Sequence, residues 1–238
     1  MGKITILKTP IKAVLFDLDD TLWPITPVIE QAEKVLHEWL LKHAPAVAER
    51  YSIDLLRSRR QELMHIEPRY QIDLWGLRHK TLSDAFRQVG ADVALVDHAM
   101  GVFSTARNAV TPFADVLPGL AKLNTRLAVG SISNGFADLQ AIGIAHHFQT
   151  SIAAHRFGRA KPDPQIFHAA CAALDIPPQQ AVYVGDDLML DVQGAQNAGM
   201  QGVWMNRFER RLPEQCRPDA VCTTLHELDH WLINAMGA

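Results

Sequence analysis

Short apolar segments alternate with amphipathic segments from Pro112 to the end of the chain, and this alternation constrains the fold more than any other feature. The apolar segments have the length and composition of buried strands, at residues 126–132, 150–154, 181–185, 202–205 and 220–222. The amphipathic segments have helical spacing, and the main ones lie at residues 136–142, 163–174, 187–198 and 225–235. Strands that alternate with helices form right-handed crossovers, which place the strands parallel and cover both faces of the sheet. The pattern therefore predicts a doubly wound α/β fold.

The first part of the chain adds one strand and then a long helical segment. Residues 12–17 are short and apolar and predict a central strand. Four segments with helical spacing follow without a convincing strand, at residues 28–41, 54–64, 74–89 and 93–107. We therefore expect a Rossmann-like core formed by residues 1–22 and 112–238, with an all-helical subdomain inserted at residues 23–111.

Composition limits the classes of function. The 238 residues carry a formal net charge of -3, without the basic excess typical of nucleic-acid-binding proteins. Three cysteines without CxxC spacing argue against a disulfide framework and a zinc site, and they favour a reducing cytoplasm. Residues 1–10 lack the apolar core of a signal peptide, and no segment reaches the length of a membrane span. We expect a cytoplasmic protein that binds neither nucleic acid nor membranes, and no feature predicts its oligomeric state.

The predicted first strand ends in three carboxylates, those of Asp17, Asp19 and Asp20, followed by the hydroxyl of Thr21. Two like charges about 4 Å apart repel by roughly 4 kcal/mol at an effective dielectric constant near 20. Open water, a basic partner or a bound cation must offset this repulsion. Open α/β folds bind ligands at the carboxyl ends of their strands. We interpret the stretch as a metal and anion site, with a solvated acidic turn as the alternative.

Further polar groups follow other predicted strands, and together they favour the site. They are Ser133, Lys161 and the pair Asp186 and Asp191. Each has a structural alternative when taken alone. Ser133-Asn134-Gly135 is a common turn, and Lys161-Pro162-Asp163-Pro164 is typical of a helix start. Asp187 is well placed to cap the helix that follows it.

These residue types fit phosphoryl transfer. A carboxylate such as that of Asp17 can attack phosphorus and form an aspartyl phosphate. Nucleophile and substrate are both anionic, so a cation must draw them together, and Mg²⁺ prefers such oxygen ligands. Asp17 and Asp186 are the expected side-chain ligands. Asp191, one turn into the next helix, is expected near the same end of the sheet.

The remaining steps need an acid/base and groups that bind the phosphoryl oxygens. Asp19 can protonate the leaving alkoxide and then deprotonate water, a role that typically contributes about 10² to 10⁴ in rate. The Lys161 ammonium and the Ser133 hydroxyl can stabilise the phosphoryl oxygens. Thr21 and Asn134 are further candidates for phosphate binding, Thr21 by ordering the loop.

The four motifs resemble, in order, those of the haloacid dehalogenase superfamily. They are Asp17-Leu18-Asp19-Asp20-Thr21, Ser133-Asn134-Gly135, Lys161-Pro162-Asp163-Pro164 and Gly185-Asp186-Asp187-x-x-x-Asp191. The resemblance implies a Rossmann-like core with a C1-type helical cap between the first two motifs. It also implies that Asp17 is the nucleophile, that Asp19 is the acid/base whose backbone carbonyl reaches Mg²⁺, and that Asp186 is the third ligand. Asp191 would support the metal-bound waters.

Asp19 indicates which branch of the superfamily the chain resembles. Dehalogenases of this superfamily lack an Asp at that position and need no metal, so Asp19 favours Mg²⁺-dependent hydrolysis of a small phosphate ester. A 2-haloacid dehalogenase and a phosphoglycolate-type phosphatase are the enzyme alternatives. The sequence offers little to separate a hydrolase from a phosphomutase, but hydrolases are the commoner outcome. Outside enzymes, a receiver-like phospho-accepting module or a binding protein on a phosphatase scaffold would combine similar residues. The helical insert and the Asp17–Asp19 spacing argue against the receiver module.

A narrower resemblance concerns the bacterial YigB group. It rests on residues 17–22 with Pro27-Val28-Ile29, on residues 67–73 with Arg78, and on residues 185–188 with Gly199-Met200-Gln201. This resemblance implies hydrolysis of 5-amino-6-(5-phosphoribitylamino)uracil, an intermediate of riboflavin and FMN synthesis. The residues considered for substrate contact are Trp23, Arg69, Arg78 and His79, although packing or solvent exposure is the commoner role of such residues.

Overall fold

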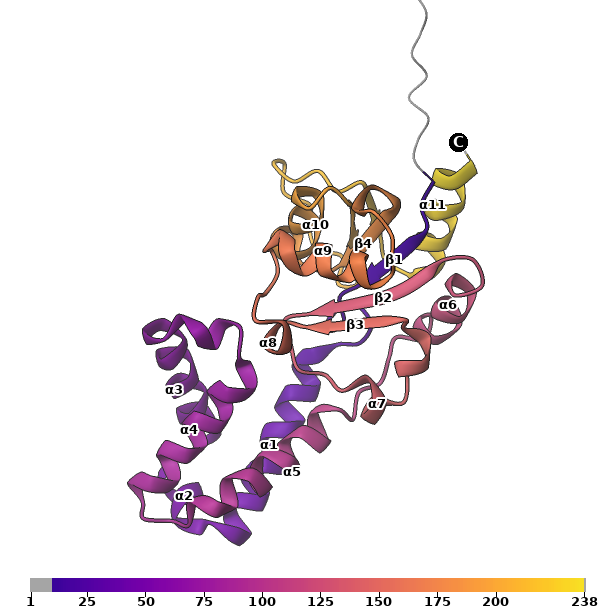
Figure 1. The fold of residues 1–238 in the computed structure, drawn as a ribbon. Coiled ribbons are helices and arrows are strands. Elements are labelled where there is room, and N and C mark those ends of the chain that lie inside the picture. Colours follow the sequence, from indigo (N-terminus) through magenta and orange to yellow (C-terminus); the bar gives the residue numbers. More distant parts are fainter. Residues whose placement is uncertain (1–9, 238) are drawn as a thin grey trace, which may run out of the picture.

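The computed structural model describes residues 10–237, and its centre is a six-stranded sheet (Figure 1). All neighbouring strands pair in parallel, in the order β3-β2-β1-β4-β5-β6. The strands are β1 (Ala13–Phe16), β2 (Ala128–Ser133), β3 (Thr150–Ala153), β4 (Ala181–Gly185), β5 (Gln201–Met205) and β6 (Ala220–Cys222). The prediction of a doubly wound parallel α/β sheet is confirmed. Residues 1–9 and 238 of the predicted core lie outside the described residues.

The two faces of the sheet pack against different helices because side chains alternate along each strand. On β1, Val14 and Phe16 join a core that includes residues of α6 (Val116–Leu123) and α11 (Leu225–Gly237). Ala13 and Leu15 face the opposite core, which includes residues of α9 (Pro164–Ala173). Each face is therefore covered, as a parallel sheet requires.

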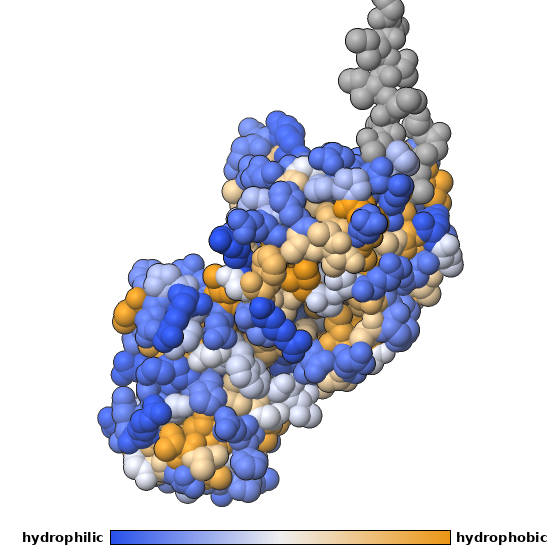
Figure 2. All heavy atoms as spheres, in the orientation of Figure 1, coloured by the Kyte–Doolittle hydropathy of each residue, from blue (hydrophilic) through white to orange (hydrophobic). Residues whose placement is uncertain are grey.

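Between β1 and α6 the chain forms helices that lie to one side of the sheet (Figure 1). They are α1 (Ile25–His43), α2 (Pro45–Arg50), α3 (Ile53–Ile66), α4 (Leu74–Gln88) and α5 (Val96–Arg107), with 3₁₀ turns η1 (Pro68–Gln71) and η2 (Val93–Leu95). These helices have their own buried core, which includes Leu36, Leu40, Phe86 and Phe103. Their visible surface is largely hydrophilic, with hydrophobic side chains gathered at the end far from the sheet (Figure 2).

Several local predictions need correction. The short helices α2 and α8 (Ala154–Phe157) were not expected from the sequence. The helix expected from residue 136 starts only at α7 (Leu139–Ile142), because the Asp138 side chain accepts hydrogen bonds from the backbone of Gln140 and Ala141 and caps it there. The helix expected over 187–198 is a π-helical segment η5 (Leu188–Gln193) followed by α10 (Gly194–Asn197). The remaining 3₁₀ turns are η3 (Ala145–His147) and η4 (Pro178–Gln180).

Candidate active site

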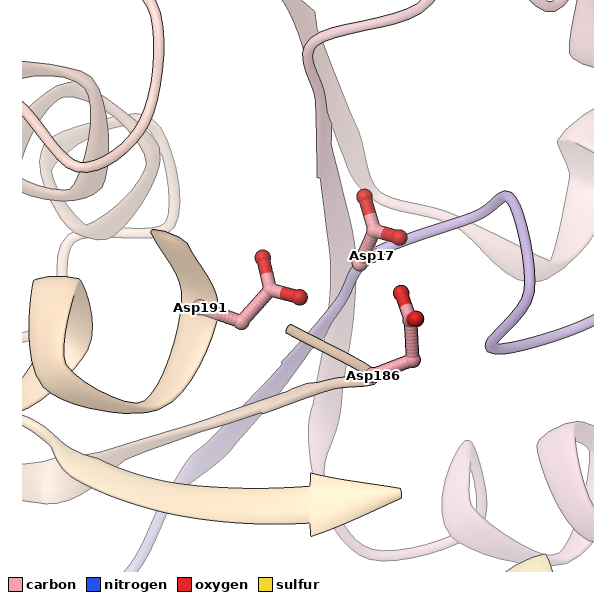
Figure 3. A group of neighbouring side chains, drawn as sticks. All are labelled: Asp17, Asp186 and Asp191. Carbon is pink, nitrogen blue, oxygen red and sulfur yellow. The ribbon is translucent and has the colours of Figure 1, made fainter. Parts of the chain in front are cut away.

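Three carboxylates meet at the carboxyl ends of the central strands (Figure 3). Asp17 directly follows β1, Asp186 directly follows β4, and Asp191 lies in η5. One oxygen of each lies within 4.8 Å of the others. β1 and β4 are neighbours in the sheet, so residues that end them must lie side by side. The structure therefore brings these three residues together, at the end of the sheet expected from the sequence.

The ammonium of Lys161 is buried among these carboxylates. Its Nζ donates to Asp17 Oδ1 and to Asp191 Oδ1, at 2.6 Å in each case. It also donates to the hydroxyl of Tyr183 at 2.9 Å. That hydroxyl in turn donates to the backbone carbonyl of Ile132 at 2.8 Å, so the three N–H groups of the ammonium and the Tyr183 O–H each have a partner. Lys161 is 5 % exposed, which makes this a desolvated ionic network.

The network holds more negative than positive charge. Burial raises the pKa of the Asp17 carboxyl well above its usual value, and the charge of Asp191 adds to this, although the Lys161 ammonium opposes both. Burial alone would lower the pKa of Lys161, but Asp17 and Asp191 outweigh it and hold that pKa above its usual value. One ammonium therefore does not compensate the carboxylates around it.

Asp186 forms the outer side of the cluster. Its Oδ2 accepts a hydrogen bond from Arg210 at 2.9 Å, and its backbone carbonyl accepts from Arg210 and from Trp204 Nε1, each at 2.8 Å. Burial raises the pKa of Asp186 to about 6, Asp191 adds to the shift, and Arg210 opposes it. These contacts fix the residue at the mouth of the site.

A divalent cation fits this cluster by its chemistry. The donors are carboxylate oxygens, which Mg²⁺ prefers, and three of them meet beside the ammonium of Lys161, which pairs with only two. Asp17 and Asp186 would hold the ion. Asp191 already bonds Lys161 and accepts from the backbone amide of Asp187 at 2.9 Å, so it would support the ion from behind.

Asp19 lies outside this cluster and has different partners. Its carboxylate accepts from Arg107 and from Trp23 Nε1. Asp19 is thus separated from the three grouped carboxylates, although it is only two residues from Asp17. The contact of its backbone carbonyl with Mg²⁺, which the family resemblance implies, stays a prediction.

Residues 133–135, at the end of β2 and in the turn after it, lie against both Lys161 and Asp19. The Ser133 hydroxyl accepts from the amide of Gly135 at 2.9 Å. The Asn134 side chain donates to the Lys161 carbonyl at 3.1 Å and accepts from the Lys161 amide at 2.9 Å. Asn134 therefore positions the lysine, and its role in phosphate binding stays a prediction. A Cβ on Gly135 would lie 2.7 Å from Asp19 Oδ2, so only glycine leaves room for that carboxylate.

The loop after Asp17 is held from two sides. Asp20 has a φ of 58°, a left-handed conformation that Asp tolerates, and its side chain accepts from the amide of Ile25 at the start of α1. Arg207 donates to the Thr21 carbonyl at 3.0 Å while it pairs with Asp115. The Thr21 hydroxyl is buried without a partner among residues 10–237, and its predicted phosphate contact is not shown. Asp187 caps η5, as expected, by accepting from Met189 and Leu190.

A cleft of about 710 Å³ opens beside Lys161. The inserted helical segment contributes Gln71 and Ile72 to its lining, and the sheet side contributes Asn134, Arg159, Asp163 and Leu190 among others. The residues considered for substrate contact from the sequence lie elsewhere. Arg69 pairs with Glu67, Arg78 is buried beside Glu33, and His79 is exposed beside Asp97. Of that group only Trp23 contacts a site residue, Asp19.

Sequence reasoning missed three residues of the site. Tyr183 carried a usable signal, because a tyrosine inside a buried strand needs a partner for its hydroxyl. Arg107 resembled an ordinary basic residue in the last turn of a helix, and Arg210 lies in a loop without any pattern.

The family follows from comparison with known proteins. The model of the haloacid dehalogenase-like hydrolases matches residues 11–199, which is most of the chain. This chain belongs to the haloacid dehalogenase-like hydrolase family. The family resemblance drawn from the four motifs is thereby confirmed, and the parallel sheet agrees with it.

Relatives of this hydrolase carry phosphatase names. A glyceraldehyde 3-phosphate phosphatase of Methanopyrus kandleri is 32% identical over 207 residues, covering 83% of this chain and 84% of that protein. The 5-amino-6-(5-phospho-D-ribitylamino)uracil phosphatase YigB of Escherichia coli is 30% identical, covering 82% of this chain and 83% of that protein.

Solved structures of similar fold include both branches of the family. The 2-haloacid dehalogenase of Pseudomonas syringae superposes with a TM-score of 0.89 at 34% identity, covering 94% of this chain and 99% of that one. A HAD phosphatase of Thermococcus onnurineus gives a TM-score of 0.67 at 26% identity, covering 93% of this chain and 98% of that one. Within residues 10–237 of this hydrolase, no helix has the length and apolar character needed to cross a membrane.

Proposed function

We propose that this hydrolase is a Mg²⁺-dependent phosphomonoesterase that forms an aspartyl phosphate on Asp17. The observation that carries the proposal is the grouping of Asp17, Asp186 and Asp191 around Lys161, with a further carboxylate, that of Asp19, two residues after the nucleophile. The phosphatase names of the relatives support the same reaction class.

The residues divide the reaction between them. When bound, the cation supplies positive charge that lets two anions approach and stabilises the charge of the transferring phosphoryl group. An oxygen of Asp17 attacks phosphorus, and the bond from phosphorus to the alkoxide breaks. Asp19 gives its proton to the alkoxide, which leaves as an alcohol. Lys161 and Ser133 hold the phosphoryl oxygens.

Water then completes the cycle. Asp19, now a carboxylate, takes a proton from a water molecule whose oxygen attacks the phosphorus of the aspartyl phosphate. The bond to Asp17 breaks, inorganic phosphate leaves, and Asp19 is again protonated. The same side chain thus serves as acid and as base, as in other two-step transfers.

Haloacid dehalogenation is the second candidate, since the neighbour in Pseudomonas syringae bears that title. Displacement of halide from carbon needs no cation and no proton donor to the leaving group. The three-carboxylate cluster and Asp19 would then have no chemical role. Release of chloride from 2-chloropropionate, measured with and without Mg²⁺, separates the two functions.

For the substrate we propose a small phosphate ester with an uncharged, polar leaving group. Among the cleft residues, Arg159 is paired with Asp163 at 2.8 Å, and the Lys161 ammonium is held by Asp17 and Asp191. Each charged residue of the lining therefore already has an ion-pair partner, which disfavours a leaving group that carries a carboxylate or an amine. The phosphoribityl compound named for the Escherichia coli relative has an uncharged polyol chain and is one candidate.

A screen of phosphorylated metabolites with Mg²⁺ and with a chelator tests this function. We expect phosphate release from sugar and polyol phosphates that stops when the chelator removes the ion. Equal release in both conditions would overturn the metal dependence. Failure of every ester to turn over would favour the phospho-accepting or binding alternatives. To test whether the phosphoribityl compound is the substrate, its kcat/KM is compared with that of ribitol 5-phosphate. Equal kcat/KM values for the two esters would count against this substrate.

A further inference from the structure

The two connections between the sheet and the inserted helices meet at one side chain, that of Asp19. The chain leaves the sheet through Trp23 and returns after Arg107, the last residue of α5. The connections run side by side, since the Phe113 amide donates to the Leu22 carbonyl at 3.0 Å. Each of them supplies a hydrogen-bond donor to the Asp19 carboxylate.

Arg107 makes the stronger of these contacts. One guanidinium nitrogen, Nη2, lies 2.7 Å from Asp19 Oδ1 and 2.7 Å from Oδ2. The residue is 1 % exposed, so the ion pair is held in a desolvated site. Its other terminal nitrogen, Nη1, is buried without a partner in the described part of the chain. Burial of an incompletely paired guanidinium destabilises a fold, which argues that the contact serves more than stability.

Trp23 fixes the same carboxylate from the other connection. Its Nε1 donates to Asp19 Oδ1 at 2.8 Å, and its ring is fully buried. Gly135 lies close to the same carboxylate, because a Cβ on this residue would come within 2.7 Å of Asp19 Oδ2. Both oxygens of Asp19 thus have fixed positions, as a proton-transfer group requires, since tolerances there are about half an ångström.

We infer that Arg107, with Trp23, is a positioning residue for Asp19 and sets the rate of both proton transfers in this enzyme. The inference rests on the proposed function, in which Asp19 is the acid/base. Arg107 does not touch the phosphorus or the leaving group in this account. It holds the carboxylate beside the turn at Ser133, so that the proton can pass to the alkoxide and later from water.

The chemistry provides a readout that a merely structural role would not change. An alkyl phosphate releases an alkoxide, which needs the proton of Asp19. p-Nitrophenyl phosphate releases p-nitrophenolate, which is stable without one. Both esters form the same aspartyl phosphate, whose hydrolysis needs Asp19 as the base. Misplacement of Asp19 should therefore slow the first step for the alkyl ester only, and the second step for both.

The experiment compares these esters in Arg107→Gln and in the wild-type protein with Mg²⁺. For glycerol 3-phosphate we expect kcat to fall roughly 10- to 100-fold with little change in KM. This loss is smaller than the full contribution of a general acid/base, because Asp19 is displaced and not removed. With p-nitrophenyl phosphate under single-turnover conditions we expect nearly normal release of p-nitrophenolate. In the steady state, a burst should precede a rate well below that of wild type.

Three further variants make the outcome specific. Arg60→Gln is a matched control, because Arg60 is also a largely buried arginine of the inserted helices and pairs with Glu33. It should leave the ratio of alkyl to aryl rates unchanged. Arg107→Lys keeps the charge and should restore part of kcat. Trp23→Phe removes one donor and should give a weaker form of the same pattern, which provides the test if Arg107→Gln does not fold.

The outcomes separate the inference from the proposed function. A wild-type protein that hydrolyses neither ester contradicts both. A wild-type protein that hydrolyses them, with Arg107→Gln lowering both first-step rates equally or matching Arg60→Gln, overturns the inference alone. A loss confined to KM would also overturn it, because positioning of Asp19 predicts a change in kcat.

Discussion

The Lys161 ammonium lies 2.6 Å from Asp17 Oδ1, although 144 residues separate the two in the sequence. The same ammonium contacts Asp191 at 2.6 Å, so it is the shared counter-ion of two buried carboxylates. Both carboxylates are buried, so the lysine supplies the positive charge beside Asp191 and beside Asp17, the proposed nucleophile.

Replacement of Lys161 by Met tests this relationship. The change leaves two adjacent carboxylates buried without their cation, and removal of one partner of a buried pair typically costs about 3–5 kcal/mol. We expect a loss of that order in the free energy of unfolding, measured by urea titration, together with loss of turnover. Mg²⁺ should raise the Tm of the variant more than that of wild type, because the ion supplies the missing positive charge.

Tyr183→Phe is the matched control for this variant. It removes a neutral hydrogen-bonding partner of Lys161 and leaves the charges in place. The expected loss is about 1 kcal/mol. If Lys161→Met were as stable as Tyr183→Phe and retained turnover, Lys161 would not be the counter-ion of the site.

Selectivity against charged leaving groups is the second prediction. Glyceraldehyde 3-phosphate and 3-phosphoglycerate differ only by an aldehyde in place of a carboxylate. The cleft residues offer no free cation, so kcat/KM should favour the aldehyde by at least about tenfold, equivalent to about 1.4 kcal/mol. Phosphate release from each ester over a range of concentrations measures the ratio.

A variant can reverse this preference. Gln71 lines the cleft from the inserted helical segment. Gln71→Arg should raise kcat/KM for 3-phosphoglycerate relative to the aldehyde, whereas Gln71→Leu should not. An unchanged ratio in Gln71→Arg, or equal hydrolysis of both esters by wild type, would show that the leaving group does not contact this cleft.

The third prediction concerns the reactivity of the cysteine thiols, two of which are buried in the core. Burial raises the pKa of Cys171 to about 11 and that of Cys222 to about 12, and both side chains are nearly inaccessible. Since the thiolate is the reactive form, iodoacetamide at pH 8 should alkylate Cys216 alone in the folded protein. Denaturant should expose the other two. Peptide mass spectrometry identifies the labelled residues, and rapid labelling of Cys171 without denaturant would contradict the packing on that face of the sheet.

Much of the fold could be predicted because its signals are local. The apolar segments before Asp17 and before Asp186 both end in carboxylates, and strand ends of a parallel sheet must share one edge. That rule brings Asp17 and Asp186 together, and Asp191 follows because it lies in η5, directly after Asp186 and Asp187. The short helix α2 was not predicted because its six residues, which begin with Pro45, give too short a window for periodicity.

The partners of the site residues were harder to predict, for a physical reason. Arg78 and Arg107 are both buried arginines of the inserted helices, and their sequence surroundings do not distinguish them. Arg78 is buried beside Glu33, but Arg107 contacts Asp19 because the returning connection passes the end of β1. Such pairings depend on the relative placement of whole helices, which no local pattern encodes.

The most direct measurement is chemical trapping of the covalent intermediate. The protein is mixed with radiolabelled substrate and Mg²⁺, quenched in acid, and reduced with borohydride, which converts an aspartyl phosphate to homoserine. The proposed mechanism predicts transient label in the protein and homoserine at position 17 in the peptide map. Asp17→Asn should remain folded by circular dichroism, take up no label and show no turnover. Label on another residue, or near-normal turnover by Asp17→Asn, would contradict the account.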